Sequence, residues 1–128
     1  MTGRAPRVVI ADDDDDIRGL MIIAAKRAGV EVVAALDNGR AALDTLLSEV
    51  VDLAVLDISM PGLNGVEVAE AVRAQRPDTL ILMVSASVQL LTDHGVVAER
   101  SDSFIIKPFS PRVLTERIRA MLGIEVSA

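Results

Sequence analysis

The sequence predicts an α/β domain in which a parallel sheet is covered by helices on both faces. Five short apolar runs recur along the 128 residues. These runs are nearly continuous in hydrophobicity, which is typical of parallel strands buried on both faces, whereas the strands of a sandwich alternate between apolar and polar residues. The segments between them carry apolar residues at helical spacing. Strands that alternate with helices favour a doubly wound sheet with right-handed crossovers.

The five apolar runs are the predicted strands, and none is longer than an ordinary buried strand. They are Val8–Ala11, Val32–Leu36, Leu53–Leu56, Leu80–Val84 and Phe104–Ile106. No run approaches the roughly 20 apolar residues that span a bilayer. The N-terminus carries two arginines but leads into only a few apolar residues, so it lacks the pattern of a signal peptide. We therefore expect a soluble, cytoplasmic chain with no membrane contact.

Helices are predicted after each strand. Apolar residues at helical spacing indicate the first two helices. In the first they are Ile17, Leu20, Met21, Ala24, Ala25 and Ala28, and in the second Leu43, Leu46, Leu47 and Val50. The third helix is expected to begin at Asn64-Gly65, because asparagine is a good N-cap. Gly29 lies where the first helix should end, as a C-terminal cap.

The last two helices differ in how clearly the sequence marks them. Residues 88–98 keep some apolar periodicity, but Gly95 interrupts it, so a fourth helix is only weakly indicated there. Ser110-Pro111 is a strong start signal for the fifth helix, because serine caps the first turn and proline is favoured at its first position. Gly123 is placed to end it.

Composition excludes several classes of site. There is no cysteine, so disulfides, thiolate metal sites and thiol nucleophiles are all absent. His94 is the only histidine, and we interpret it as an exposed helix residue. The formal net charge of −6 argues against direct binding to nucleic acid, which requires clustered Lys and Arg. A chain of 128 residues is expected to form one domain.

Polar residues follow the predicted strands where each strand ends. Asp12-Asp13 follow the first strand, Asp57 the third, Ser85 the fourth and Lys107 the fifth. In an open α/β sheet, ligands bind beyond the carboxyl ends of the strands. With the flavodoxin-like strand order 2-1-3-4-5, the first and third strands are neighbours. Asp12, Asp13 and Asp57 should therefore share one hollow.

Three close carboxylates raise one another's pKa unless a cation lies between them. Mg²⁺ fits best, because it takes a few oxygen ligands and keeps open positions for phosphoryl oxygens. Lys107 and the Ser85 hydroxyl would complete a set of groups suited to a phosphoryl group in transfer. Asp57 is then the candidate nucleophile, forming an acyl phosphate.

The chain resembles the receiver domain of two-component response regulators, and chemotaxis-type single-domain regulators in particular. The resemblance covers essentially the whole chain, from Arg7 to about Leu122, and implies a single receiver domain over 1–128 with that core. The motifs that carry it are Ile10-Ala11-Asp12-Asp13-Asp14, Leu56-Asp57-Ile58-Ser59-Met60-Pro61-Gly62, Asn64-Gly65, Val84-Ser85-Ala86 and Ile106-Lys107-Pro108-Phe109. Each motif is weak alone, and together they are specific.

The resemblance implies that Asp57 accepts a phosphoryl group from a histidine kinase or a histidine phosphotransfer protein. It further implies that Asp13, Asp57 and the Ser59 backbone carbonyl bind Mg²⁺, with Asp12 acting mainly through a metal-bound water. Ser85 and Phe104 lie where the family has its switch pair.

That switch acts on the surface of the fourth helix, fifth strand and fifth helix, which would bind a downstream protein target. A homodimer that depends on phosphorylation stays open. The implied role is a signalling phosphoacceptor with slow autodephosphorylation, not an enzyme that turns over substrate.

Other interpretations fit the sequence less well. A haloacid-dehalogenase phosphatase needs a second aspartate two residues after the nucleophile, and Ser59 stands there after Asp57. A flavodoxin-like electron carrier needs a phosphate loop after the first strand, where five aspartates would repel a flavin phosphate. A calcium loop fails because Ile17 replaces its glycine. A receiver kept only as a docking module would normally have lost its key residues. Ser85 as a strand-end cap and Phe104 as a core residue are the structural alternatives.

Overall fold

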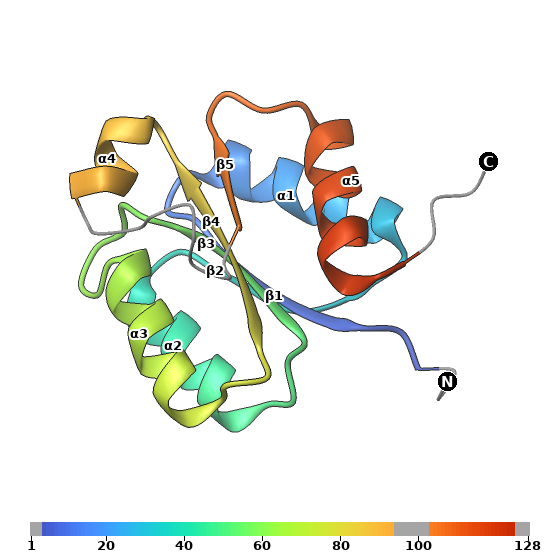
Figure 1. Ribbon diagram of the computed structural model, residues 1–128, viewed down its shortest axis with the longest axis horizontal. Helices are drawn as coiled ribbons and strands as arrows, with labels where there is room; N and C mark the ends of the chain where they lie inside the picture. Colours follow the sequence, from blue (N-terminus) through green and yellow to red (C-terminus); the bar gives the residue numbers. More distant parts are fainter. Residues whose placement is uncertain (1–3, 94–102, 125–128) are drawn as a thin grey trace.

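The computed structural model describes residues 4–93 and 103–124, in which five strands alternate with five helices. Every strand pair is parallel, and the strands lie in the order β2-β1-β3-β4-β5. Figure 1 shows the sheet in the middle of the molecule with helices on both sides. The predicted doubly wound, flavodoxin-like architecture is therefore confirmed.

Each strand is one residue longer than its apolar run. The strands are β1 (Arg7–Ala11), β2 (Glu31–Leu36), β3 (Leu53–Asp57), β4 (Leu80–Ser85) and β5 (Ser103–Ile106). All residues of β3 are buried, as expected for a strand covered on both faces. The same expectation is wrong for β2, whose apolar residues are only partly buried, because β2 lies at an edge of the sheet.

The helices are α1 (Asp15–Ala28), α2 (Gly39–Ser48), α3 (Gly65–Gln75), α4 (Val88–Asp93) and α5 (Pro111–Leu122). The predicted caps are present: the Asn64 and Ser110 side chains accept hydrogen bonds from backbone N–H groups in the first turns of α3 and α5. Gly29 and Gly123 end α1 and α5 with φ of 87° and 70°, which favours glycine. None of these helices is long and apolar enough to cross a membrane.

Two apolar residues assigned to helix faces are exposed instead. Val50 is 64% exposed, because α2 ends at Ser48 and the chain is already extended at Glu49. Leu20 is 39% exposed, because it flanks the buried stripe of α1. The prediction of a fourth helix over 88–98 is met by α4 as far as Asp93. His94, Gly95 and the rest of that segment lie outside the described residues.

The core has two layers, one on each face of the sheet. Neighbouring residues of β1 point to opposite layers, so Val9 and Ala11 pack with α2, α3 and α4, while Val8 and Ile10 pack with α1 and α5. Burial on both faces ties the central strands firmly to their neighbours. The carboxyl ends of these strands thus hold the functional side chains on a rigid base.

Candidate functional site

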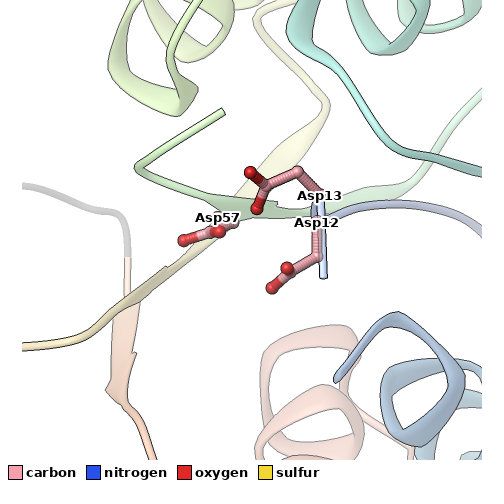
Figure 2. A group of neighbouring side chains, drawn as sticks. All are labelled: Asp12, Asp13 and Asp57. Atoms are coloured by element: carbon pink, nitrogen blue, oxygen red, sulfur yellow. The ribbon is translucent and has the colours of Figure 1, made fainter. Parts of the chain in front are cut away.

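The carboxyl ends of the central strands bring three aspartates together. Asp12 and Asp13 follow β1 directly, and Asp57 is the last residue of β3, the neighbour of β1. One carboxylate oxygen from each lies within 4.8 Å of the others. Asp12 and Asp57 are buried, whereas Asp13 is exposed. Figure 2 shows the three side chains projecting from the ends of the two strands.

Lys107 is the cation that pairs with the two buried carboxylates. It follows β5, and its Nζ lies 3.0 Å from Asp12 Oδ2 and 3.2 Å from Asp57 Oδ2. Its backbone N–H donates to the Ser85 carbonyl at 2.7 Å, which fixes the start of the side chain beside β4. Burial alone would lower the pKa of Lys107, but its pairing with the two carboxylates outweighs burial and the pKa is raised. Lys107 therefore carries its positive charge into the site.

The surroundings of Asp57 clearly shift the pKa of its carboxyl group. Its pKa is raised from the ordinary 3.8 to about 6, mainly by burial and in addition by the neighbouring Asp12. Lys107 acts in the opposite direction, as does the Ser59 N–H, which donates to Asp57 Oδ1 at 3.4 Å. At neutral pH the Asp57 carboxyl is therefore mostly ionised. Its ionisation costs free energy because the group is buried, and a nearby cation would reduce that cost.

The donor set fits a hard divalent cation. All three candidate ligands supply carboxylate oxygens, which Mg²⁺, Ca²⁺ and Mn²⁺ prefer over nitrogen or sulfur. Asp12 Oδ2 is buried and, despite its ion pair with Lys107, has no well-aligned hydrogen bond. A buried carboxylate oxygen left in this state gains from a positive charge. The arrangement is thus a group that could hold a metal ion.

Ser85 ends β4 beside this group. It is buried, and its hydroxyl donates to the Ser87 carbonyl at 2.9 Å while accepting from the Ser87 N–H at 3.3 Å. The hydroxyl is therefore held by its own loop in this structure. Phe104 in β5 is partly buried and packs against the core layer of α2, α3 and α4. Its packing is compatible with both the core and the switch interpretations.

Close packing holds the loop after Asp57 in place. The Gly65 N–H donates to the Ile58 carbonyl at 2.9 Å, so the start of α3 lies against the end of β3. A Cβ at Gly65 would stand 2.3 Å from the Asp57 carbonyl oxygen, which no side chain can accept. Asn64 and Glu67 form a reciprocal capping box at the same point. Glycine at this position therefore sets how closely α3 approaches Asp57.

A hollow of about 410 Å³ lies away from this group, between the α2–β3 and α3–β4 connections. It is lined by residues 48–52 and 75–79 and shares no residue with the acidic group. Ligands of open α/β sheets bind at the opposite, carboxyl ends of the strands. We therefore assign the chemistry to the aspartates and not to this hollow.

The family model described as the response regulator receiver domain matches residues 8–119, nearly the whole chain. The chain belongs to this family. Receivers of this kind are signalling domains of two-component regulators, and the resemblance drawn from the sequence motifs is confirmed. The family assignment also agrees with the strand order and with the acidic group at the strand ends.

The curated relatives of this receiver are longer proteins. The chain is 35% identical over 118 residues to an uncharacterized transcriptional regulatory protein, YrkP of Bacillus subtilis, across 92% of this chain and 50% of that protein. It is 34% identical over 116 residues to the alkaline phosphatase synthesis transcriptional regulatory protein PhoP of Bacillus subtilis, across 91% and 48%. The receiver thus spans about half the length of these relatives.

Solved structures of similar receivers share the fold. A CheY-like receiver domain protein from Methanospirillum hungatei has a TM-score of 0.78 at 29% identity, over 93% of this chain and 94% of that chain. The response regulator TrrA from Thermotoga maritima, solved in complex with Mg²⁺ and BeF, has a TM-score of 0.78 at 31% identity, over 91% and 98%. The likeness extends over nearly the full length of both.

The receiver structure gathers most of the residues singled out from the sequence. Asp12, Asp13, Asp57 and Lys107 lie within one ionic group, and Ser85 ends the adjacent strand. The Ser59 backbone carbonyl as a metal ligand stays a prediction. Sequence reasoning missed Arg18, which contacts the loop carrying Asp12. Its spacing of three residues from Asp15 in a predicted first turn was the available signal.

Proposed function

We propose that Asp57 is the phosphoacceptor of this receiver. The observation that carries the proposal is a buried carboxylate whose pKa is raised to about 6, with Lys107 Nζ at 3.2 Å and two further aspartates beside it. Such a carboxylate is ionised at neutral pH yet poorly solvated, which favours attack on an electrophile. The donor is a phosphohistidine of a histidine kinase or of a histidine phosphotransfer protein.

In the transfer, an Asp57 carboxylate oxygen forms a bond to phosphorus while the phosphorus–nitrogen bond of the phosphohistidine breaks. The imidazole nitrogen keeps the electron pair and takes a proton. Lys107, already directed at the carboxylate, stabilises the charge on the phosphoryl oxygens. The Ser85 hydroxyl leaves the Ser87 carbonyl and donates to a phosphoryl oxygen. Ser85 and Lys107 thus act on the group that Asp57 receives.

We propose Mg²⁺ as the cation that the acidic group binds. Asp13, Asp57 and the Ser59 carbonyl would hold it, and Asp12 would act mainly through a bound water. When bound, Mg²⁺ supplies positive charge to the phosphoryl oxygens. The exposed carboxylate of Asp13 leaves that side of the group accessible to solvent and to a phosphodonor. The donor set described above supports this choice, since it consists of oxygens alone.

The output proposed for the phosphorylated receiver is a change of surface. Phe104 moves inward after Ser85, which alters the surface formed by α4, β5 and α5 for a downstream protein target. Phosphorylation-dependent homodimerisation through this surface is the alternative output. The net charge of −6 supports a chain that does not itself contact nucleic acid. As a phosphoacceptor with slow autodephosphorylation, the receiver is not a turnover enzyme.

We propose that residues 1–128 form one receiver domain with its core at about 7–122. The two core layers, which pack against opposite faces of one sheet, support a single unit. We place its action in the cytoplasm, where phosphoryl donors derived from ATP are made.

The test is phosphorylation by acetyl phosphate, read by intact mass. Wild type with Mg²⁺ should gain the mass of one phosphoryl group. Asp57→Asn should gain none, and wild type without Mg²⁺ should gain none. The control is Asp44→Asn, an exposed aspartate of α2, which should behave as wild type. A folded wild type that gains no mass would contradict the phosphoacceptor role and favour the docking-module interpretation. A gain retained in Asp57→Asn would move the acceptor to another residue.

A further inference from the structure

Arg18 joins the helix α1 to the loop that carries the acidic group. From the first turn of α1, its Nη1 donates to the backbone carbonyl of Asp12 at 3.0 Å. Its Nη2 donates to Asp15 Oδ1 at 2.6 Å. The side chain is 20% exposed, so most of it is packed against the protein. The guanidinium therefore bridges the two ends of the segment between β1 and α1.

The segment that Arg18 bridges contains Asp13. On one side, Asp12 is held by Arg18 through its carbonyl and by Lys107 through its carboxylate. On the other, the Asp14 N–H donates to Asp12 Oδ1 at 2.9 Å, and the Asp14 side chain caps α1. The backbone on both sides of Asp13 is thus restrained. The position of the Asp13 carboxylate depends on these restraints.

We propose that Arg18 is a positioning residue that holds the β1–α1 loop in the geometry that binds a cation. The inference rests on the proposed cation site. Arg18 does not ligate the ion, because a guanidinium has no acceptor atom. It acts through the Asp12 carbonyl, and the planar fork of arginine suits two acceptors at once. The Asp15 carboxylate is the second acceptor of this fork.

Removing Arg18 has two effects on cation affinity, and they have opposite signs. A measured affinity therefore distinguishes between them. By Coulomb's law alone, loss of a positive charge near the acidic group would strengthen cation binding. Loss of positioning would weaken it, because the loop would adopt more conformations and Asp13 would be placed correctly less often. Residues that support metal ligands typically change metal affinity by 10-fold or more when mutated. We expect positioning to prevail.

The experiment measures Mg²⁺ affinity by calorimetry for wild type, Arg18→Met, Arg18→Lys and Arg27→Met. Arg18→Met should weaken binding by about tenfold. Arg18→Lys keeps the charge but should still weaken binding, because an ammonium does not offer the two-pronged geometry of a guanidinium. Arg27→Met, an exposed residue in the last turn of the same helix, removes the same charge and should change affinity less than about twofold. Far-UV circular dichroism verifies that every variant is folded.

A second readout uses no metal. In metal-free Arg18→Met, hydrogen–deuterium exchange should be faster at residues 13–14 than in wild type, with the core strands unchanged. If Arg18→Met binds Mg²⁺ as tightly as wild type or more tightly, or if exchange at residues 13–14 is unchanged, the positioning role of Arg18 is overturned. The proposed cation site would not be affected by that result. A wild type that binds no Mg²⁺ would overturn the cation site and the inference with it. The two failures are therefore distinguishable.

Discussion

Replacement of Asp57 by asparagine is expected to stabilise the metal-free protein. The buried Asp57 carboxyl has its pKa raised from 3.8 to about 6, so the folded protein holds this proton more tightly than the unfolded chain. At 1.36 kcal/mol per pKa unit, ionising Asp57 above pH 6 costs the fold up to about 3 kcal/mol. Asparagine has nearly the same shape and carries no charge. Lys107 keeps Asp12 as its partner in the variant.

The sign of the pH dependence follows from the same shift. Between 3.8 and about 6 the folded state binds more protons, so falling pH stabilises wild type relative to Asp57→Asn. The full difference is expected at about pH 8, roughly half of it at pH 5 and little near pH 4. Urea unfolding followed by far-UV circular dichroism is the suitable assay, because the chain has no Trp or Tyr.

The control for this experiment is Asp44→Asn, which removes an exposed charge and should change stability by less than about 0.5 kcal/mol. Mg²⁺ should reduce the difference in stability between Asp57→Asn and wild type, because it binds the wild-type site. A ligand present at ten times its Kd stabilises the protein that binds it by about 1.4 kcal/mol. An Asp57→Asn protein no more stable than wild type at about pH 8, or a difference that grows as pH falls, would refute the reasoning.

Three further variants and one control variant test the packing and charge of the site by urea unfolding. Lys107→Met leaves two buried carboxylates without their cation. The free energy of unfolding should fall by about 3 kcal/mol at about pH 8 and by less at pH 5. A loss below about 1 kcal/mol at about pH 8 would contradict the ion pairing. Gly65→Ala should cost about 1–3 kcal/mol, because its Cβ meets the Asp57 carbonyl, whereas Gly19→Ala in open space on α1 should be neutral or stabilising. Equal effects of the two would argue against the close approach. Asn64→Ala should lose about 1 kcal/mol with the capping box, and no loss would contradict the cap.

Most of the confirmed predictions depend on local sequence pattern. Continuous apolar runs mark the strands, and Ser110-Pro111 marks a helix start, because each signal acts within a few residues. The juxtaposition of Asp12 with Asp57 was also predictable once β1 and β3 were placed side by side. Parallel strands bring their carboxyl ends to one edge whatever the details of packing.

The predictions that are wrong concern the solvent exposure of apolar residues. Leu20 and Val50 are apolar and suitably spaced, yet both face solvent. Whether an apolar residue is buried depends on where its helix ends and on which element covers it, and neither is encoded in the spacing alone. The edge position of β2 is a similar case, since the partial burial of its residues follows from the sheet order.

By itself, the sequence determined the fold class and, with the strand order 2-1-3-4-5 that this class commonly has, which carboxylates meet at the strand ends. Only the tertiary structure decided that Lys107 lies between Asp12 and Asp57, that burial and the neighbouring Asp12 raise the pKa of Asp57 to about 6, and that Arg18 grips the Asp12 carbonyl. The reason is physical: patterns of a few residues specify elements and their ends, whereas ångström distances between side chains depend on contacts among elements far apart in the chain.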